Sequence, residues 1–191
     1  MLRYRALITA ALVSLVASSA FAAVTWDAVK KKATGAQDYS TIYKYSGPKG
    51  DLKFDYRCVL PGKIRTEILE SKPDGSRVGT VLVYDSGWNK DKVRAKTGGG
   101  MITRNTTHKD VADTPFYQPI YSLILNQVSG APTVSADGGK TRFDFKTGTG
   151  KYSIWANDAG EILKTERTDG RDKETREFSN IKFNSKPSVD F

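Results

Sequence analysis

Apolar and polar residues alternate along much of this chain of 191 residues, in short runs separated by Gly, Pro, Asn and Asp. Residues 51–60 carry apolar side chains at every second position, and residues 63–70 continue the alternation beyond a Pro61-Gly62 step. A period of two predicts strands, and regularly spaced short strands favour a curled sheet or barrel. The predicted strands lie at 51–60, 63–70, 78–87, 90–100, 100–107, 140–148, 150–160, 160–170 and 173–183.

Two segments break this pattern and predict helices. Residues 25–36 read as a short helix that Thr25 caps and Gly35 ends. Residues 114–130 place Phe116, Ile120 and Ile124 at steps of four, which is typical of an amphipathic helix that ends near Gly130. Residues 129–140 are predicted to be a flexible loop. We therefore expect a mainly β chain with two or three helices (α+β), folded as an antiparallel half-open β-barrel whose helices cover the concave face.

The first 22 residues predict export. Arg3 and Arg5 precede a short uncharged apolar run, and Ala20 and Ala22 flank Phe21 in an A-x-A cleavage pattern. The apolar run is shorter than the roughly 20 residues that span a bilayer. We expect residues 1–22 to be a signal peptide, cleavage near Ala22-Ala23, a single domain over residues 23–191, and a periplasmic or secreted location.

Composition narrows the partners further. Without Arg3 and Arg5, 28 basic residues remain against 21 acidic residues, a net charge of +7. In an exported protein this charge favours anionic lipid or envelope polymers over nucleic acid, although interspersed Lys and Arg can also be a solvated surface. Cys58 is the single cysteine, so we expect a buried, unreactive thiol and no internal disulfide.

Motifs for catalysis are missing from the sequence. His108 is the only histidine and lies in a polar stretch, so no zinc site is expected, nor any other metal or cofactor. The sequence has no G-x-S-x-G motif, and Val134 stands where a phosphate-binding loop would need its first glycine. We expect that the chain is not an enzyme. A hydrolase with two paired carboxylates stays open, because many acidic residues are present and none stands out.

Two stretches resemble a known family. The sequence "CVLPGKIRTEI" is similar to the strand, Pro-Gly, Arg, strand step of the periplasmic lipoprotein carriers of the LolA/LolB type. The ending "DAGEILKTERTDGRDKETREFSNIKFNSKPSVDF" resembles the C-terminal strands of the same superfamily. On the next strand, the carriers have an Asp-Gly step followed by an aromatic residue. This chain departs from that pattern, because Ser86 separates Asp85 from Gly87-Trp88. The chain therefore looks like an uncharacterised exported branch of this superfamily.

This resemblance implies a hydrophobic cavity between the sheet and its helices. The ligand would be a lipid, an acyl chain or another apolar molecule, and a lipoprotein or a membrane-bound delivery partner would be a further possibility. The chain would act as a monomer without cofactor or metal. The predicted ligand-binding residues are Phe54, Tyr56, Ile64, Arg65, Ile68, Phe116, Ile120, Ile124 and Trp155.

Two questions stay open at this point. Arg65 and Ile64 alternate along one strand, so they face the cavity together only if the Pro-Gly step shifts the register. The alternative function is an envelope interaction or sensor module on the same fold, with a filled core and a basic binding surface.

Overall fold

The structure is a computed structural model that describes residues 23–48, 50–72, 74–97, 99–105, 116–148 and 150–191. The predicted signal peptide, its cleavage site and His108 lie outside these residues. Within them, no helix is long or apolar enough to span a membrane.

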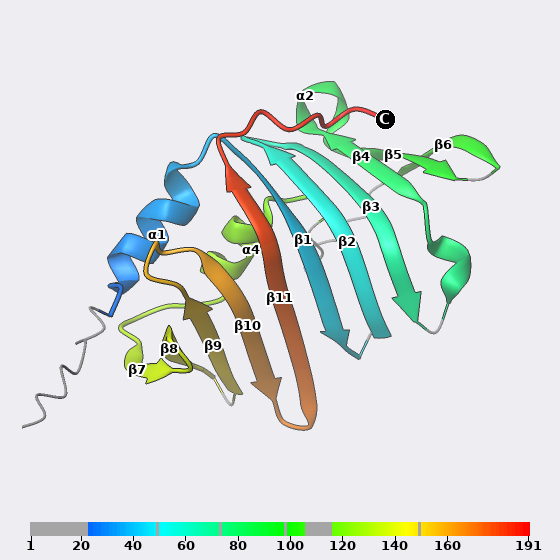
Figure 1. Ribbon diagram of the computed structural model, residues 1–191. Coiled ribbons are helices and arrows are strands. Elements are labelled where there is room, and N and C mark those ends of the chain that lie inside the picture. Colours follow the sequence, from blue (N-terminus) through cyan, green and yellow to red (C-terminus); the bar gives the residue numbers. More distant parts are fainter. Residues whose placement is uncertain (1–22, 49, 73, 98, 106–115, 149) are drawn as a thin grey trace, which may run out of the picture.

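One antiparallel sheet of eleven strands forms the body of the protein, in the order β6-β5-β4-β3-β2-β1-β11-β10-β9-β8-β7 (Figure 1). The strands of the first half are β1 (Asp38–Gly47), β2 (Gly50–Val59), β3 (Lys63–Lys72), β4 (Val81–Asp85), β5 (Lys92–Thr97) and β6 (Gly100–Asn105). Those of the second half are β7 (Thr133–Asp137), β8 (Lys140–Thr147), β9 (Gly150–Ala156), β10 (Ile162–Asp169) and β11 (Asp172–Phe183). The sheet curves without closing, as the predicted half-open barrel requires.

Each half of the sheet is a meander in which neighbouring strands are also neighbours in sequence. The halves meet where β1 pairs with β11, from Tyr39 opposite Phe183 to Ser46 opposite Thr175. The register shifts between Ser40 and Ile42, so the central ladder contains an irregularity. The first and last strands therefore lie side by side in the middle of the sheet.

Two helices pack on one face of the sheet, which we call the concave face. The first is α1 (Trp26–Gly35), whose N-cap Thr25 accepts a hydrogen bond from the Ala28 amide at 3.2 Å. The second is α4 (Ile120–Asn126), which buries Ile120, Tyr121, Leu123 and Ile124. Figure 1 shows α4 behind the central strands. The short α2 (Ser86–Asn89) and the 3-10 turn η1 (Gly75–Arg77) belong to connections between strands.

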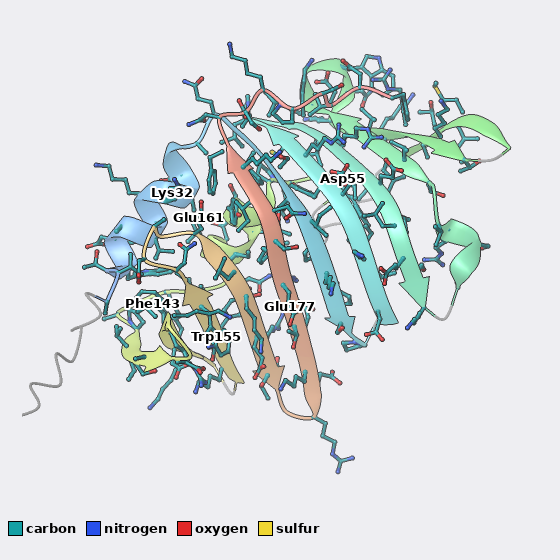
Figure 2. All side chains as sticks on the ribbon, in the orientation of Figure 1. Lys32, Asp55, Phe143, Trp155, Glu161 and Glu177 are labelled. Carbon is teal, nitrogen blue, oxygen red and sulfur yellow. The ribbon has the colours of Figure 1, made fainter. Side chains whose placement is uncertain are left out.

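The opposite face, which we call the convex face, is covered by charged pairs between alternate or neighbouring strand residues. Figure 2 shows this face and labels Asp55, Trp155 and Glu177 on it. The pairs include Arg57–Asp55 (2.7 Å), Arg65–Glu67 (2.9 Å), Arg142–Asp144 (2.9 Å) and Lys173–Glu166 (3.2 Å). Because each strand alternates its side chains, one face of the sheet is core and the other is an ionic surface.

The Pro61-Gly62 step is a hairpin turn between β2 and β3, as the sequence indicates. A Cβ atom at Gly62 would collide with the Ser86 side chain, and the Ser86 amide donates to the Gly62 carbonyl at 3.0 Å. The glycine is thus required because the start of α2 packs directly against this turn.

Two local predictions are wrong, and one helix ends earlier than predicted. Residues 38–47 form the central strand β1, although no strand is predicted there, and residues 133–137 form β7 instead of a flexible loop. The predicted second helix is present and runs from Ile120 to Asn126, which is about two turns, but it ends before Gly130. Pro119 precedes this helix as its N-cap residue, with extended ψ, and thereby sets its start.

Candidate functional site

Seven of the nine predicted ligand-binding residues come together on the concave face. Phe54 and Tyr56 come from β2, Ile64 and Ile68 from β3, and the others from the segment that leads into and forms α4. The ring of Phe116 meets the ring of Phe54 edge-on, with centroids 5.5 Å apart. The residues gathered here are Phe54, Tyr56, Ile64, Ile68, Phe116, Ile120 and Ile124.

Tyr56 joins the sheet to α4 through its hydroxyl. The hydroxyl donates to the Gln118 carbonyl at 3.3 Å and accepts from the Ile120 amide at 3.2 Å. The N-cap residue Pro119 makes no side-chain cap hydrogen bond. Tyr56 thus satisfies the first amide of α4, which a capping Ser or Asp would do in an ordinary helix. Burial raises the pKa of Tyr56 well above its usual value, so the hydroxyl stays neutral.

Aromatic side chains that the sequence analysis leaves out complete this face. Tyr121 of α4 contacts the ring of Tyr39, with centroids 4.7 Å apart, and stacks on Phe183 at 5.7 Å. Tyr43 stacks between Phe54 and Phe178, at 5.4 and 5.5 Å. The signal for two of these residues is present in the sequence, because Tyr39, Thr41, Tyr43 and Tyr45 alternate along "DYSTIYKYSG".

Helix α1 covers the other end of the concave face. Trp26 lies against Phe143 and Phe145 of β8, with ring centroids 5.3 and 5.0 Å apart. Val29, on the same helix, is fully buried. The concave face is therefore apolar from β3 to β8, and two helices that are not part of the sheet cover it.

Side chains fill the described part of this face. Tyr56, Ile120, Ile124 and Phe143 have no solvent-exposed surface, and Tyr39 and Tyr43 have about 1% each. A ligand that binds among these residues must therefore displace one of the covering helices. Helix α4 has seven residues, and four buried side chains together with the Tyr56 hydroxyl hold it on the sheet.

Arg65 and Trp155 lie on the convex face, so the predicted residues do not form one site. Arg65 pairs with Glu67 at 2.9 Å and donates from its Nε to the Asp190 carbonyl at 3.1 Å. Its neighbour Ile64 takes the concave side, and the Pro-Gly step does not shift the register. This answers the question that the sequence leaves open.

Trp155 lies on the convex face for the same reason, because side chains alternate along β9 and Ile154 and Ala156 take the concave side. Its indole nitrogen donates to Asp137 at 2.7 Å. The cations of Arg142 and Lys164, which are its neighbours across β8 and β10, lie 4.9 and 4.7 Å from its ring centroid. Trp155 therefore stabilises the ionic surface by cation–π contacts.

A cation that sequence reasoning misses does lie on the concave face. Arg176 of β11 is 3% exposed and stands opposite Tyr45 of β1, on the same side as Phe178. It pairs with Glu174, and one of its terminal nitrogens lies 3.4 Å from the Tyr152 hydroxyl. Its Nε has no hydrogen-bond partner. No motif marks this arginine, which the sequence shows only as one of several charged residues in "KETREF".

Cys58 is fully buried on the concave face, as predicted. Burial raises the pKa of its thiol to about 11, so the reactive thiolate is scarce at neutral pH. Among the residues that the structure describes, no three His, Cys, Asp or Glu side chains are grouped so as to hold a metal ion.

Comparison with solved structures places this architecture. LprF from Mycobacterium bovis matches with 12% identity over 86% of this chain and 95% of that chain, at a TM-score of 0.53. The lipoprotein LppX from Mycobacterium tuberculosis matches with 10% identity over the same shares, at a TM-score of 0.52. The chain has the fold of LprF and LppX. A LolA superfamily protein from Nitrosomonas europaea matches more loosely, with 10% identity over 86% of this chain and 96% of that chain, at a TM-score of 0.37.

The predicted resemblance to this group of proteins is thus confirmed at the level of the fold. No family model matches the chain, and no curated protein sequence matches it. The likeness to LprF and LppX therefore rests on the open, helix-covered sheet and not on shared residues.

Proposed function

We propose that the protein binds a hydrophobic ligand on the concave face, under α4, and carries it within the cell envelope. The observation that carries this proposal is the apolar concave face covered by a short helix whose first amide is held by one side chain of the sheet, Tyr56. Displacement of α4 would uncover the aromatic rings of Tyr39, Phe178 and Phe183, which Tyr121 of α4 contacts. The ligand would be a lipid, an acyl chain or the lipid part of a lipoprotein.

The energy of acyl-chain burial supports this kind of ligand. Each buried methylene contributes about 0.8 kcal/mol, so a chain of about a dozen carbons gains roughly 10 kcal/mol before the cost of moving the helix. Release of α4 would break the two hydrogen bonds by which the Tyr56 hydroxyl holds the start of the helix to the sheet. The apolar side chains of α4 and an acyl chain could therefore replace one another on the concave face, so that the ligand can be both bound and released.

Arg176 would bind the polar end of such a ligand. It is the buried cation of the concave face, and its unpartnered Nε is a free donor for a carboxylate or phosphate oxygen. This replaces Arg65, which the convex face places beyond the reach of a concave ligand. The location in the envelope belongs to the same proposal, and the fold shared with the lipoprotein LppX supports it. Binding without catalysis is likewise part of the proposal.

The experiment uses the chain from residue 23 onward, purified without detergent. An environment-sensitive fluorescent fatty acid is titrated into it, and the native protein is extracted for lipid mass spectrometry. Saturable probe binding, together with a co-purified lipid, is the expected result. Absence of both would contradict the proposal.

The second candidate is an envelope interaction module that binds through its surface and carries no ligand. The fully buried side chains of the described concave face favour it. The same titration separates the two functions, because a module with a permanently filled core takes up no probe even at high probe concentration.

A further inference from the structure

Large apolar side chains are exposed at one corner of the sheet, outside the buried cluster of the concave face. The corner combines α2, the edge strand β6 and the segment 184–191, and these lie together in Figure 1. Trp88 is 51% exposed, Met101 60%, Ile102 39% and Phe191 38%. We call these four residues the apolar corner. The other large apolar residues described as exposed, Val78 and Val134, lie in η1's connection and in β7.

Arg94 of β5 holds two members of the apolar corner in place. Its guanidinium lies 5.1 Å from the Trp88 ring centroid and 5.5 Å from the Phe191 ring centroid, so both rings contact the same cation. Trp88 is further fixed by α2, since Asp85 accepts from the Gly87 and Trp88 amides at 2.9 and 3.3 Å. These contacts hold the rings of Trp88 and Phe191 in fixed positions.

Cross-strand register places the other two members at the sheet edge. Met101 stands opposite Lys96, on the same convex face as Arg94, whereas Ile102 stands opposite Ala95 on the concave side. Because β6 is the outermost strand, the edge presents an apolar side chain on each face. Such an arrangement suits insertion of the edge into an apolar medium rather than contact with water.

Positive charge surrounds the apolar corner. Residues 86–97 contain four basic residues and one acidic residue, and Lys92 and Lys96 are exposed. The adjacent Asp85 is engaged by Lys63, whose Nζ lies 3.2 Å from it. A Trp beside exposed lysines is the combination that binds the interface of a bilayer with anionic lipids.

A row of arginines explains how Phe191 reaches this corner. Arg57, Arg65 and Arg94 occupy one cross-strand row on the convex face, with Val83 between the last two. Arg57 lies 3.4 Å from the Ser188 carbonyl and Arg65 lies 3.1 Å from the Asp190 carbonyl. The row thus binds the segment 184–191 across the sheet and ends with Phe191 beside Arg94.

We propose that the apolar corner docks the protein on the surface of an anionic lipid bilayer. Trp88, Met101 and Phe191 enter the headgroup region while Lys92 and Lys96 contact anionic headgroups. This surface goes beyond the proposed ligand site, since it lies at another part of the sheet and binds the membrane as a whole. Because Met101, Lys92 and Lys96 lie on the convex face at this edge of the sheet, the helices that cover the concave face stay clear of the membrane.

Flotation with vesicles tests the proposal. Vesicles of phosphatidylcholine with phosphatidylglycerol are compared with vesicles of phosphatidylcholine alone, at low and at high salt. The expected result is co-flotation with the anionic vesicles, weakened by salt. A blue shift of Trp88 emission should accompany it and be absent in Trp88→Phe, which keeps an aromatic ring and so keeps docking.

Matched variants localise the contact. The double change Trp88→Ala with Met101→Ala should weaken vesicle binding about tenfold or more. Lys92→Gln with Lys96→Gln should weaken it about thirtyfold at low salt, from the usual contribution of a basic residue at an anionic surface. The controls remove an exposed apolar residue and two exposed lysines near the opposite edge, with Val134→Ala and with Lys140→Gln plus Lys146→Gln, and should bind as the original chain does.

Three outcomes would overturn the proposal. These are no flotation with anionic vesicles, equal flotation with neutral vesicles, and equal losses in corner and control variants. Binding of the fluorescent fatty acid by the corner variants reports separately on the concave site. An intact acyl site without vesicle binding therefore contradicts membrane docking alone, and the reverse pattern contradicts only the proposed function.

Discussion

The two faces of the sheet use the same strands for opposite purposes. Along β2, Phe54, Tyr56 and Cys58 are buried on the concave face, while Asp55 and Arg57 between them form an ion pair with their side chains 23% and 31% exposed. The concave face consists mainly of buried apolar side chains, and the convex face carries oppositely charged side chains that pair with one another. The difference teaches that a residue must be assigned to a face before it is assigned a function, as Arg65 and Arg176 show.

Truncation of one residue on each face should give the largest contrast. Phe54→Ala is expected to lower the free energy of unfolding by about 3–5 kcal/mol, because it leaves a cavity between Tyr43 and Phe116. Arg57→Ala, three positions along, should lower it by less than about 1 kcal/mol, because its pair is partly exposed. Urea unfolding followed by circular dichroism measures both. Similar losses for the two variants would mean that the faces are not as different as described.

Separate replacement of Arg176 on the concave face and Arg65 on the convex face tests the same contrast for ligand binding. Arg176→Gln with Glu174→Gln should remove the preference for a fatty acid over the fatty alcohol of equal length, a loss of about 1.5–3 kcal/mol for a charged hydrogen bond. Arg65→Gln should leave that preference unchanged, because Arg65 faces the other side. Competition against the fluorescent probe gives both affinities. A preference that depends on Arg65 and not on Arg176 would overturn the assignment.

Removal of one hydroxyl tests the attachment of α4. Tyr56→Phe deletes the acceptor of the Ile120 amide and should weaken α4 by about 1 kcal/mol. Faster amide hydrogen exchange in α4 and faster probe uptake are expected. Tyr121→Phe is the matched control on the helix itself, since the Tyr121 hydroxyl is buried without a hydrogen-bond partner. It should leave exchange and uptake unchanged, and an equal response of both variants would exclude the special role of Tyr56.

Titration of Cys58 should have almost no effect on stability near neutral pH, and its effect becomes visible only at alkaline pH. The folded pKa of about 11 lies above that of an unfolded thiol, about 8.5. The protonated thiol therefore favours folding fully below the unfolded pKa, and this contribution is lost as the pH rises toward 11. Unfolding free energy measured from pH 8 to 11 should fall more steeply for the original chain than for Cys58→Ala. Parallel curves would contradict burial of the thiol.

Much of the fold follows from the sequence because alternation is a local signal. The hairpin at Pro61-Gly62, the concave positions of Phe54 and Ile64, and the buried Cys58 all follow from parity along two strands. The same parity indicates that Arg65 opposes Ile64, but it does not say which of the two sides is covered. That choice is made by α1 and α4, which come from distant parts of the chain.

The missed features depend on tertiary pairing. Residues 38–47 include five polar side chains among the tyrosines and become a strand because β2 and β11 flank them. The five residues of β7 are all exposed, so they carry no burial pattern and are held only by the ladder to β8. Arg176 is buried by residues from β1 and β9, which no local motif around it reveals.

The central pairing of β1 with β11 also determines when the sheet can be completed during folding. Each meander is built from neighbours in sequence, whereas the ladder at the seam joins residues such as Tyr43 and Phe178 across nearly the full chain. A chain made from its N-terminus holds β1 as an open edge until the last strand has been added. The final strand therefore acts as the closing piece of the assembly, and the seam is where a growing or damaged chain would be most exposed to a foreign strand.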